Sequence, residues 1–149
     1  MARSNFFSRL FLSISIIILS LDQIVKYIID KSMSLGQSIP LIPNILHLTY
    51  IHNTGAGFGI LRDMNSLLIW ISLIIIGAIL YNYDKIPKEN IPQAATALII
   101  GGAAGNLISR IFQGYVIDFI DFRVWPSFNV ADSAITIGAI ILVIYLWKK

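Results

Sequence analysis

Two pairs of polar residues interrupt long apolar stretches, and the members of each pair are spaced to share one face of a helix. Asp22 and Lys26 are four residues apart, and so are Asn106 and Arg110. Side chains at this spacing are neighbours on a helix surface, where opposite charges can pair. An ionisable residue inside an apolar span is costly, and its presence indicates a functional site.

Three further aspartates, Asp118, Asp121 and Asp132, lie in the last third of the chain. Two carboxyl groups held close together resist double ionisation and can share one proton. The ionised member of such a pair can activate water while the protonated member polarises a carbonyl. In extended chain, residues three apart point to opposite faces, and only one of Asp118 and Asp121 can then face Asp132. Aspartates that meet at one site are therefore able to catalyse acid–base reactions, and hydrolysis of an amide bond is one of these.

Each polar motif also has a structural interpretation. Asp22 with Lys26 can be a salt bridge that only fixes helix packing. The spacing of Asn129 and Asp132 is typical of a capping arrangement at a helix start, where a carboxylate also suits the helix dipole. For Asp121 we favour a solvated loop acid. These separate structural interpretations become less convincing when all of the motifs have to be explained together.

Glycine-rich segments flank the polar residues. Gly101 and Gly105 have the G-x-x-x-G spacing that lets another helix approach closely, and we interpret them as a packing face. Residues 53–59 are also rich in glycine, but no Lys-Ser or Lys-Thr follows as in a phosphate loop. We expect a flexible turn at the membrane surface there.

The composition is that of a membrane protein. Hydrophobic residues make up 56% of the chain and charged residues 13%, against roughly 25% charged in soluble domains. The Lys and Arg residues form no basic stripe, which argues against nucleic acid binding. Cysteine is absent, and the two histidines, His47 and His52, lie in a polar loop. We therefore expect no metal site and no cofactor.

Four apolar stretches are long enough to cross a bilayer, which takes about 20 residues. They predict an all-α membrane protein, a single domain over 1–149, with spans at about 10–30, 66–83, 93–112 and 131–147. The first run has no cleavage site for a signal peptidase and is expected to be a retained helix. The long connection 31–65 contains a stretch rich in β-formers, residues 41–51, which predicts a small β element at the membrane surface.

The charge distribution predicts the orientation of the spans. An even number of spans places both termini on one side, with six Lys and Arg residues against four on the other side. This bias favours cytoplasmic termini. The two groups are Arg3, Arg9, Lys85, Lys88, Lys148 and Lys149 inside, and Lys31, Arg62, Arg110 and Arg123 outside. Segments 31–65 and 113–130 are then extracytoplasmic.

With this orientation nearly every unusual polar residue lies at one depth, near the outer face, while the inner halves of the spans carry almost nothing comparable. This convergence is the main indication of a site. A small proton-coupled transporter is the principal alternative, although a transporter needs polar residues through both leaflets. A non-catalytic assembly factor is a third possibility.

Taken together, the motifs resemble those of the bacterial lipoprotein signal peptidases (signal peptidase II). The five motifs that carry the resemblance read, in chain order, DQIVK at 22–26, NTGAGF at 53–58, GGAAGNLISR at 101–110, VIDFIDF at 116–122 and FNVADSAI at 128–135. They run through the whole chain together with the four spans.

The resemblance implies an aspartic endopeptidase of the bacterial cytoplasmic membrane, with Asp118 and Asp132 as the catalytic pair. It implies that the substrates are prolipoproteins whose cysteine carries a diacylglyceryl group, cut just before that cysteine. We expect a monomer in contact with membrane lipid and without nucleic acid. Eight residues at motif positions are expected to line or support the site: Asp22, Lys26, Asn53, Gly55, Asn106, Arg110, Asn129 and Ala131.

One position departs from the family pattern. The family usually has aspartate before the arginine of the third-helix motif, and this chain has Ser109. Serine still forms hydrogen bonds but carries no charge. We further expect Asn106 and Arg110 to orient Asp118, since Arg offers fixed donors to a carboxylate.

Overall fold

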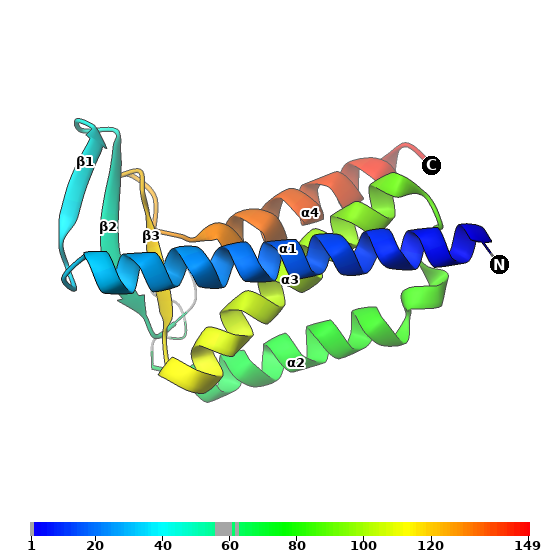
Figure 1. The fold of residues 1–149 in the computed structure, drawn as a ribbon, viewed down its shortest axis with the longest axis horizontal. Coiled ribbons are helices and arrows are strands. Elements are labelled where there is room, and N and C mark those ends of the chain that lie inside the picture. Colours follow the sequence, from blue (N-terminus) through cyan, green and yellow to red (C-terminus); the bar gives the residue numbers. More distant parts are fainter. Residues whose placement is uncertain (1, 56–60, 62) are drawn as a thin grey trace.

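The structure, a computed structural model, describes residues 2–55, 61 and 63–149. Within these residues, four α-helices extend lengthwise through the molecule, and a small β-sheet stands across one end of them (Figure 1). Both chain termini lie at the opposite end. The helices are α1 (Ala2–Ser32), α2 (Asn65–Tyr81), α3 (Asn90–Gln113) and α4 (Val130–Trp147), and a 3₁₀ turn, η2 (Tyr83–Lys85), follows α2.

The predicted spans each coincide with one of these helices, and the predicted helical fold is confirmed. Within the described residues, three helical segments are long and apolar enough to cross a membrane: 8–32 of α1, and the whole of α3 and α4. Helix α2 is also apolar but has 17 residues. Apolar side chains such as Ile16, Ile74 and Val143 are more than half exposed, as expected for helices that face lipid.

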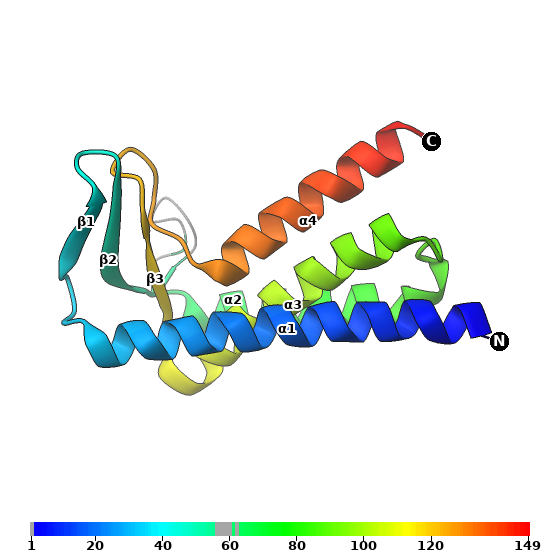
Figure 2. The ribbon, with the colours of Figure 1, turned by 45° about the horizontal axis from the view of Figure 1, so that its top comes forward.

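The sheet has three antiparallel strands, β1 (Ser38–Ile42), β2 (Leu46–Asn53) and β3 (Val116–Asp121), in that spatial order. The predicted β element at 41–51 is therefore confirmed as part of the β1–β2 hairpin. The third strand was not predicted, because it pairs with a segment more than 60 residues away along the chain. The rotated view in Figure 2 shows the strands running across the helix axes.

Helix α3 contacts both α1 and α4 through glycines. A Cβ on Gly101 would lie 2.7 Å from the Ser15 carbonyl oxygen of α1, and one on Gly102 would lie 2.5 Å from the Ala131 carbonyl oxygen of α4. The expected packing role of the small-residue run is thus confirmed. The close approach brings polar side chains of three helices within hydrogen-bonding range.

A buried apolar cluster joins the sheet to the end of α1. It consists of Ile29, Met33, Tyr50, Ile117 and Phe119. Ile29 comes from α1, Met33 follows the end of α1, and the other three side chains come from β2 and β3. The cluster fixes the height of β3 above the helices, and β3 carries one of the candidate catalytic acids.

Candidate active site

Asp118 lies on β3 and is held by two side-chain amides. Its Oδ2 accepts a hydrogen bond of 2.8 Å from Asn53 Nδ2, and its Oδ1 accepts one of 2.7 Å from Asn129 Nδ2. The residue is 2% exposed. Asn53 belongs to the neighbouring strand β2, and strand pairing brings the two residues together. The carboxyl is therefore fixed from the sheet and from the helices at once.

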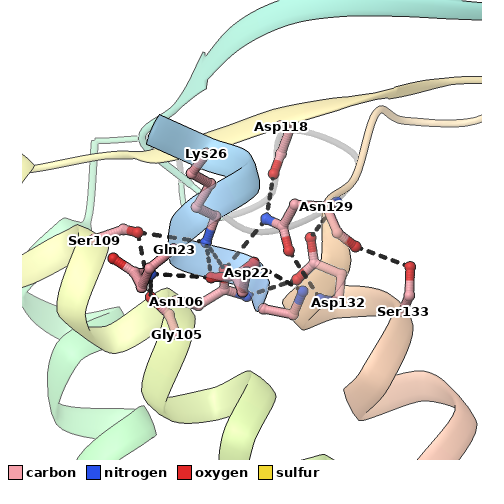
Figure 3. A network of polar contacts seen from close by, with 11 residues as sticks. Asp22, Gln23, Lys26, Gly105, Asn106, Ser109, Asp118, Asn129, Asp132 and Ser133 are labelled. Carbon is pink, nitrogen blue, oxygen red and sulfur yellow. Dashed lines mark hydrogen bonds and ion pairs between the residues drawn. The ribbon is translucent and has the colours of Figure 1, made fainter. Parts of the chain in front are cut away.

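Asn129 and Asp132 form a capping box at the start of α4. The Asp132 backbone N–H donates to Asn129 Oδ1 at 2.9 Å, and the Asn129 backbone N–H donates to Asp132 Oδ2 at 3.3 Å. The capping interpretation is confirmed. Because the cap uses Asn129 Oδ1, the amide Nδ2 remains available for Asp118. Asn129 thus contacts both acids and lies between them (Figure 3).

Asn106 of α3 holds the other oxygen of Asp132. Its Nδ2 donates to Asp132 Oδ1 at 2.7 Å, and its Oδ1 accepts from Lys26 Nζ at 2.9 Å. An ammonium group can only donate, and it therefore attracts the amide oxygen of Asn106 and leaves the NH₂ group for Asp132. Lys26 consequently sets the orientation of Asn106.

The predicted pair of Asp22 and Lys26 is present and buried, with 2.7 Å between Asp22 Oδ2 and Lys26 Nζ. Asp22 Oδ1 also accepts from the backbone N–H of Ala131 at 3.0 Å. The pair therefore fixes two parts of the site: Lys26 orients Asn106, and Asp22 holds the first turn of α4. A Cβ on Gly105 would lie 2.5 Å from Asp22 Oδ2, which means that only glycine leaves room for this carboxylate.

Gln23 belongs to the same network and was missed. Its Nε2 donates to Asp22 Oδ2 and to the Gly105 carbonyl oxygen, both at 3.0 Å. The signal in the sequence was a polar amide beside Asp22 within an apolar span. Figure 3 shows these contacts on the side of α1.

The expectation that Asn106 and Arg110 orient Asp118 is wrong. Asn106 bonds to Asp132, while Arg110 Nη2 donates to the Gly55 carbonyl oxygen at 3.2 Å. Asn53 is oriented in turn by the backbone N–H of Gly55, which donates to Asn53 Oδ1 at 2.9 Å. The rest of that loop motif, Ala56, Gly57 and Phe58, lies outside the described residues, as does Arg62.

Asp121 is not the solvated loop acid that we favoured. It is 7% exposed and accepts hydrogen bonds from Thr49 Oγ1 at 2.8 Å and from Arg123, through the backbone N–H at 2.8 Å and Nη1 at 3.0 Å. Burial by itself raises the pKa of Asp121, but these hydrogen bonds outweigh burial and hold the pKa below its usual range. A permanently ionised acid suits a structural role.

Ser109, the departure from the family pattern, is buried beside Lys26. Its Oγ donates to the Gly105 carbonyl oxygen at 3.2 Å and accepts from Lys26 Nζ at 3.4 Å. The longer second distance indicates a weak bond. Lys26 therefore has Asp22 as its only carboxylate partner among the described residues.

The two histidines do not come together. His47 contacts Ser38 at the exposed side of the β1–β2 hairpin, whereas His52 contacts Tyr50. Within residues 2–55, 61 and 63–149, no three His, Asp or Glu side chains gather into a set that can hold a metal ion.

A cavity of about 610 Å³ opens between β3, α3 and the start of α4, and both candidate acids line it. Burial, followed by the nearby charge of Asp132, raises the pKa of Asp118 to about 7, although the Asn53 and Asn129 amides oppose this rise. Asp118 can therefore hold a proton near neutral pH. The cavity is lined by Asn53, Gly55, Asn106, Arg110, Val116, Asp118, Trp125, Pro126, Ser127, Phe128, Asp132, Ser133, Thr136 and Ile137.

Comparison with known proteins gives a consistent result. Residues 14–148 match the family model described as signal peptidase (SPase) II. A lipoprotein signal peptidase of Halothermothrix orenii is 47% identical over 90% of this chain and 92% of its own length. One from Streptococcus pyogenes is 44% identical over 95% of both chains. A solved bacterial membrane enzyme superposes with a TM-score of 0.87 at 38% identity, covering 93% of this chain and 87% of that chain.

Proposed function

The chain belongs to the signal peptidase II family, and from this premise we propose that Asp118 and Asp132 are the catalytic pair of an aspartic endopeptidase. The observation that carries the proposal is their arrangement on one cavity, joined through Asn129. Asp118 is buried and has a pKa raised to about 7. A pair that shares one proton at neutral pH needs such a shift.

The proposed reaction follows from this arrangement. The ionised carboxyl accepts a proton from water, and the water oxygen attacks the scissile carbonyl carbon. The protonated carboxyl donates a hydrogen bond to the carbonyl oxygen and later supplies the proton that the leaving nitrogen needs. Because the two acids titrate as one unit, neither protonation state is assigned to one residue.

Arg110 is suited to hold the substrate backbone. It lines the cavity, and its buried Nε has no hydrogen-bond partner among the described residues. A guanidinium offers several N–H donors in fixed directions, and a carbonyl oxygen of a bound peptide satisfies the unused donor. Gly55, which already accepts from Nη2, keeps the guanidinium aimed at the cavity.

The proposed substrate is a prolipoprotein that carries a diacylglyceryl-modified cysteine, and the enzyme removes the signal peptide by cutting before that cysteine. Apolar side chains, among them Val116, Phe128 and Ile137, line the cavity beside the two acids. Such a substrate enters sideways from the membrane, and burial of its acyl chains contributes ~0.8 kcal/mol per CH₂. This need explains the position of the site at the edge of a helical bundle.

We propose four spans in the bacterial cytoplasmic membrane, with both termini in the cytoplasm and the site near the outer face. Helix α2, with 17 residues, is about 26 Å long at 1.5 Å per residue. This is close to the ~30 Å hydrocarbon core. Both termini lie at the end opposite the sheet, as four crossings require (Figure 1). We further propose that the enzyme acts as a monomer.

A transporter is not supported. The relatives are named as peptidases, and the ionisable network lies at the sheet end of the helices. At the other end the buried polar residue Gln93 is uncharged, and it bonds to Tyr83 and to the Pro87 carbonyl oxygen. The arrangement lacks a charged path through both halves of the described bundle.

Replacement of the two acids tests the proposal. Asp118→Asn and Asp132→Asn should each lower cleavage of a lipidated peptide in detergent by at least roughly 100-fold, the usual contribution of a general acid or base. Asp84→Asn, in the exposed turn η2, is the matched control and should cleave normally. Normal cleavage by either of the first two variants would overturn the assignment. If Asp121→Asn folds but loses activity, Asp121 and not Asp118 is the partner of Asp132.

A further inference from the structure

A second polar network, formed by Asp30, Tyr50 and His52, involves the face of β2 that points away from the catalytic cavity. Tyr50 Oη donates to Asp30 Oδ1 of α1 at 2.6 Å, and His52 Nε2 lies 2.9 Å from the same Tyr50 oxygen. The His52 ring also stacks on Tyr115, with 3.6 Å between the ring centroids. None of these side chains lines the catalytic cavity.

Strand geometry connects this second network to the catalytic acids. Side chains alternate between the two faces of a strand, and Tyr50 and His52 therefore share one face of β2 while Asn53 points to the other. Asn53 is the last residue of β2, and its amide holds Asp118. Whatever fixes Tyr50 and His52 consequently fixes the backbone from which Asn53 projects.

The second network also joins the two halves of the site. One half, with Asp118 and Asn53, belongs to the sheet, and the other half projects from the helices. Helix α1 carries Asp22 and Lys26 of the catalytic network and, two turns later, Asp30. The bond between Asp30 and Tyr50 is therefore a direct polar link between the helix half and the sheet half. Tyr50 is 4% exposed and belongs to the apolar cluster at this junction.

The protonation states follow from the geometry. Because the Tyr50 hydroxyl donates to Asp30, its oxygen can only accept from His52, which must carry its proton on Nε2. Burial raises the pKa of Tyr50 above its usual value and lowers the pKa of His52. Both groups are thus neutral near pH 7. The charged group that contacts them is Asp30 of α1, which also forms an ion pair of 3.2 Å with Lys31. The ring of Tyr115, the residue before β3, stacks on His52.

We propose that Asp30, Tyr50 and His52 are positioning residues for the catalytic pair, acting on Asp118 through Asn53. This proposal rests on the function proposed above. It has a specific consequence, because the amide of Asn53 lowers the pKa of Asp118. Removing a hydrogen bond among Asp30, Tyr50 and His52 lets Asn53 move and weakens its bond to Asp118. The pKa of Asp118 then rises further. A residue that only stabilises the fold does not produce this shift.

The test uses the full-length enzyme in detergent, labelled with ¹³C at the aspartate carboxyls. Asp118→Asn identifies the Asp118 resonance, and the pKa is then measured in each variant by titration. Tyr50→Phe, which keeps the buried ring, and His52→Leu should each raise the pKa of Asp118 by about 0.5 to 1, a three- to tenfold change in proton affinity. His52→Gln retains a donor near the Nε2 position and should restore most of the original value.

Two comparisons separate positioning from stability. His47→Leu, on the same strand but with its ring bonded to the exposed Ser38, should leave the pKa of Asp118 unchanged. Adding Tyr50→Phe to Asn53→Ala should give no further shift, because both changes act on one bond. An unchanged pKa in folded Tyr50→Phe and His52→Leu, or additive shifts in the double variant, would overturn the proposal. If the function proposed above is wrong, Asp118→Asn will cleave normally. That result is separate from the titration, because the pKa measurement does not depend on activity.

Discussion

Replacing Asp118 with asparagine should stabilise the protein at alkaline pH while it lowers cleavage by at least roughly 100-fold. The folded-state pKa of Asp118 is about 7, against an ordinary value of 3.8. A group with a raised pKa is favourable below its ordinary value, and it becomes a growing cost as pH rises through the folded-state value. The difference of roughly three pH units, at 1.36 kcal/mol each, makes ionised Asp118 cost about 4 kcal/mol above pH 7.

Asparagine removes this charge but introduces a mismatch. Asn53 and Asn129 both donate to Asp118, and the new amide group must place a donor against one of them. An unmatched buried donor costs about 1–3 kcal/mol at every pH. The change in unfolding free energy between pH 4 and pH 8 is therefore the informative quantity. Relative to the unchanged protein, Asp118→Asn should gain about 4 kcal/mol over that interval.

Thermal unfolding in detergent, followed by tryptophan fluorescence at pH 4 and pH 8, measures this gain. We expect the melting temperature of the variant, relative to the original chain, to rise on the order of 10 °C between the two pH values. Asp121→Asn is the matched control, because hydrogen bonds hold the pKa of Asp121 low. It should lower the melting temperature and show no gain at pH 8. If Asp118→Asn melts with the same pH dependence as the original chain, the raised pKa is incorrect.

Three further changes test the supporting network. Lys26→Met leaves Asp22 buried without its cation, which should destabilise the fold by about 3–5 kcal/mol; chemical unfolding measures this, and a loss below about 1 kcal/mol would contradict it. Gly105→Ala places a methyl group 2.5 Å from Asp22 Oδ2 and should lower both melting temperature and kcat, whereas an unchanged kcat would show that Asp22 can move freely. Ser109→Asp gives Lys26 a second carboxylate and should weaken its bond to Asn106; kcat should change with KM nearly constant, and a change confined to KM would place Ser109 in substrate binding instead.

The same amino acids serve folding and the proposed chemistry at the start of α4. The capping box of Asn129 and Asp132 is a common device for helix initiation. Here it also fixes the direction of Asp132 and frees one amide group for Asp118, the two acids that we propose as the catalytic pair. A structural explanation for a motif therefore does not argue against a catalytic role.

The sequence alone determined the features that depend on short-range spacing. A run of about 20 apolar residues specifies a span wherever it occurs. Residues four apart on a helix must be neighbours, which is why the pairing of Asp22 with Lys26 was predictable. The cap of α4 was likewise visible, because its two members are three residues apart.

Only the tertiary structure decided which side chain contacts which across elements. The pairing of β3 with β2 joins segments distant in the chain, and it gave Asn53 rather than Arg110 to Asp118. The same pairing buried Asp121 against Thr49. Hydrogen bonds act over about 3 Å, whereas a sequence pattern fixes a residue only to a face and a depth. The choice of partner therefore depends on how closely the glycines of α3 let the helices approach and on where the sheet rests above them.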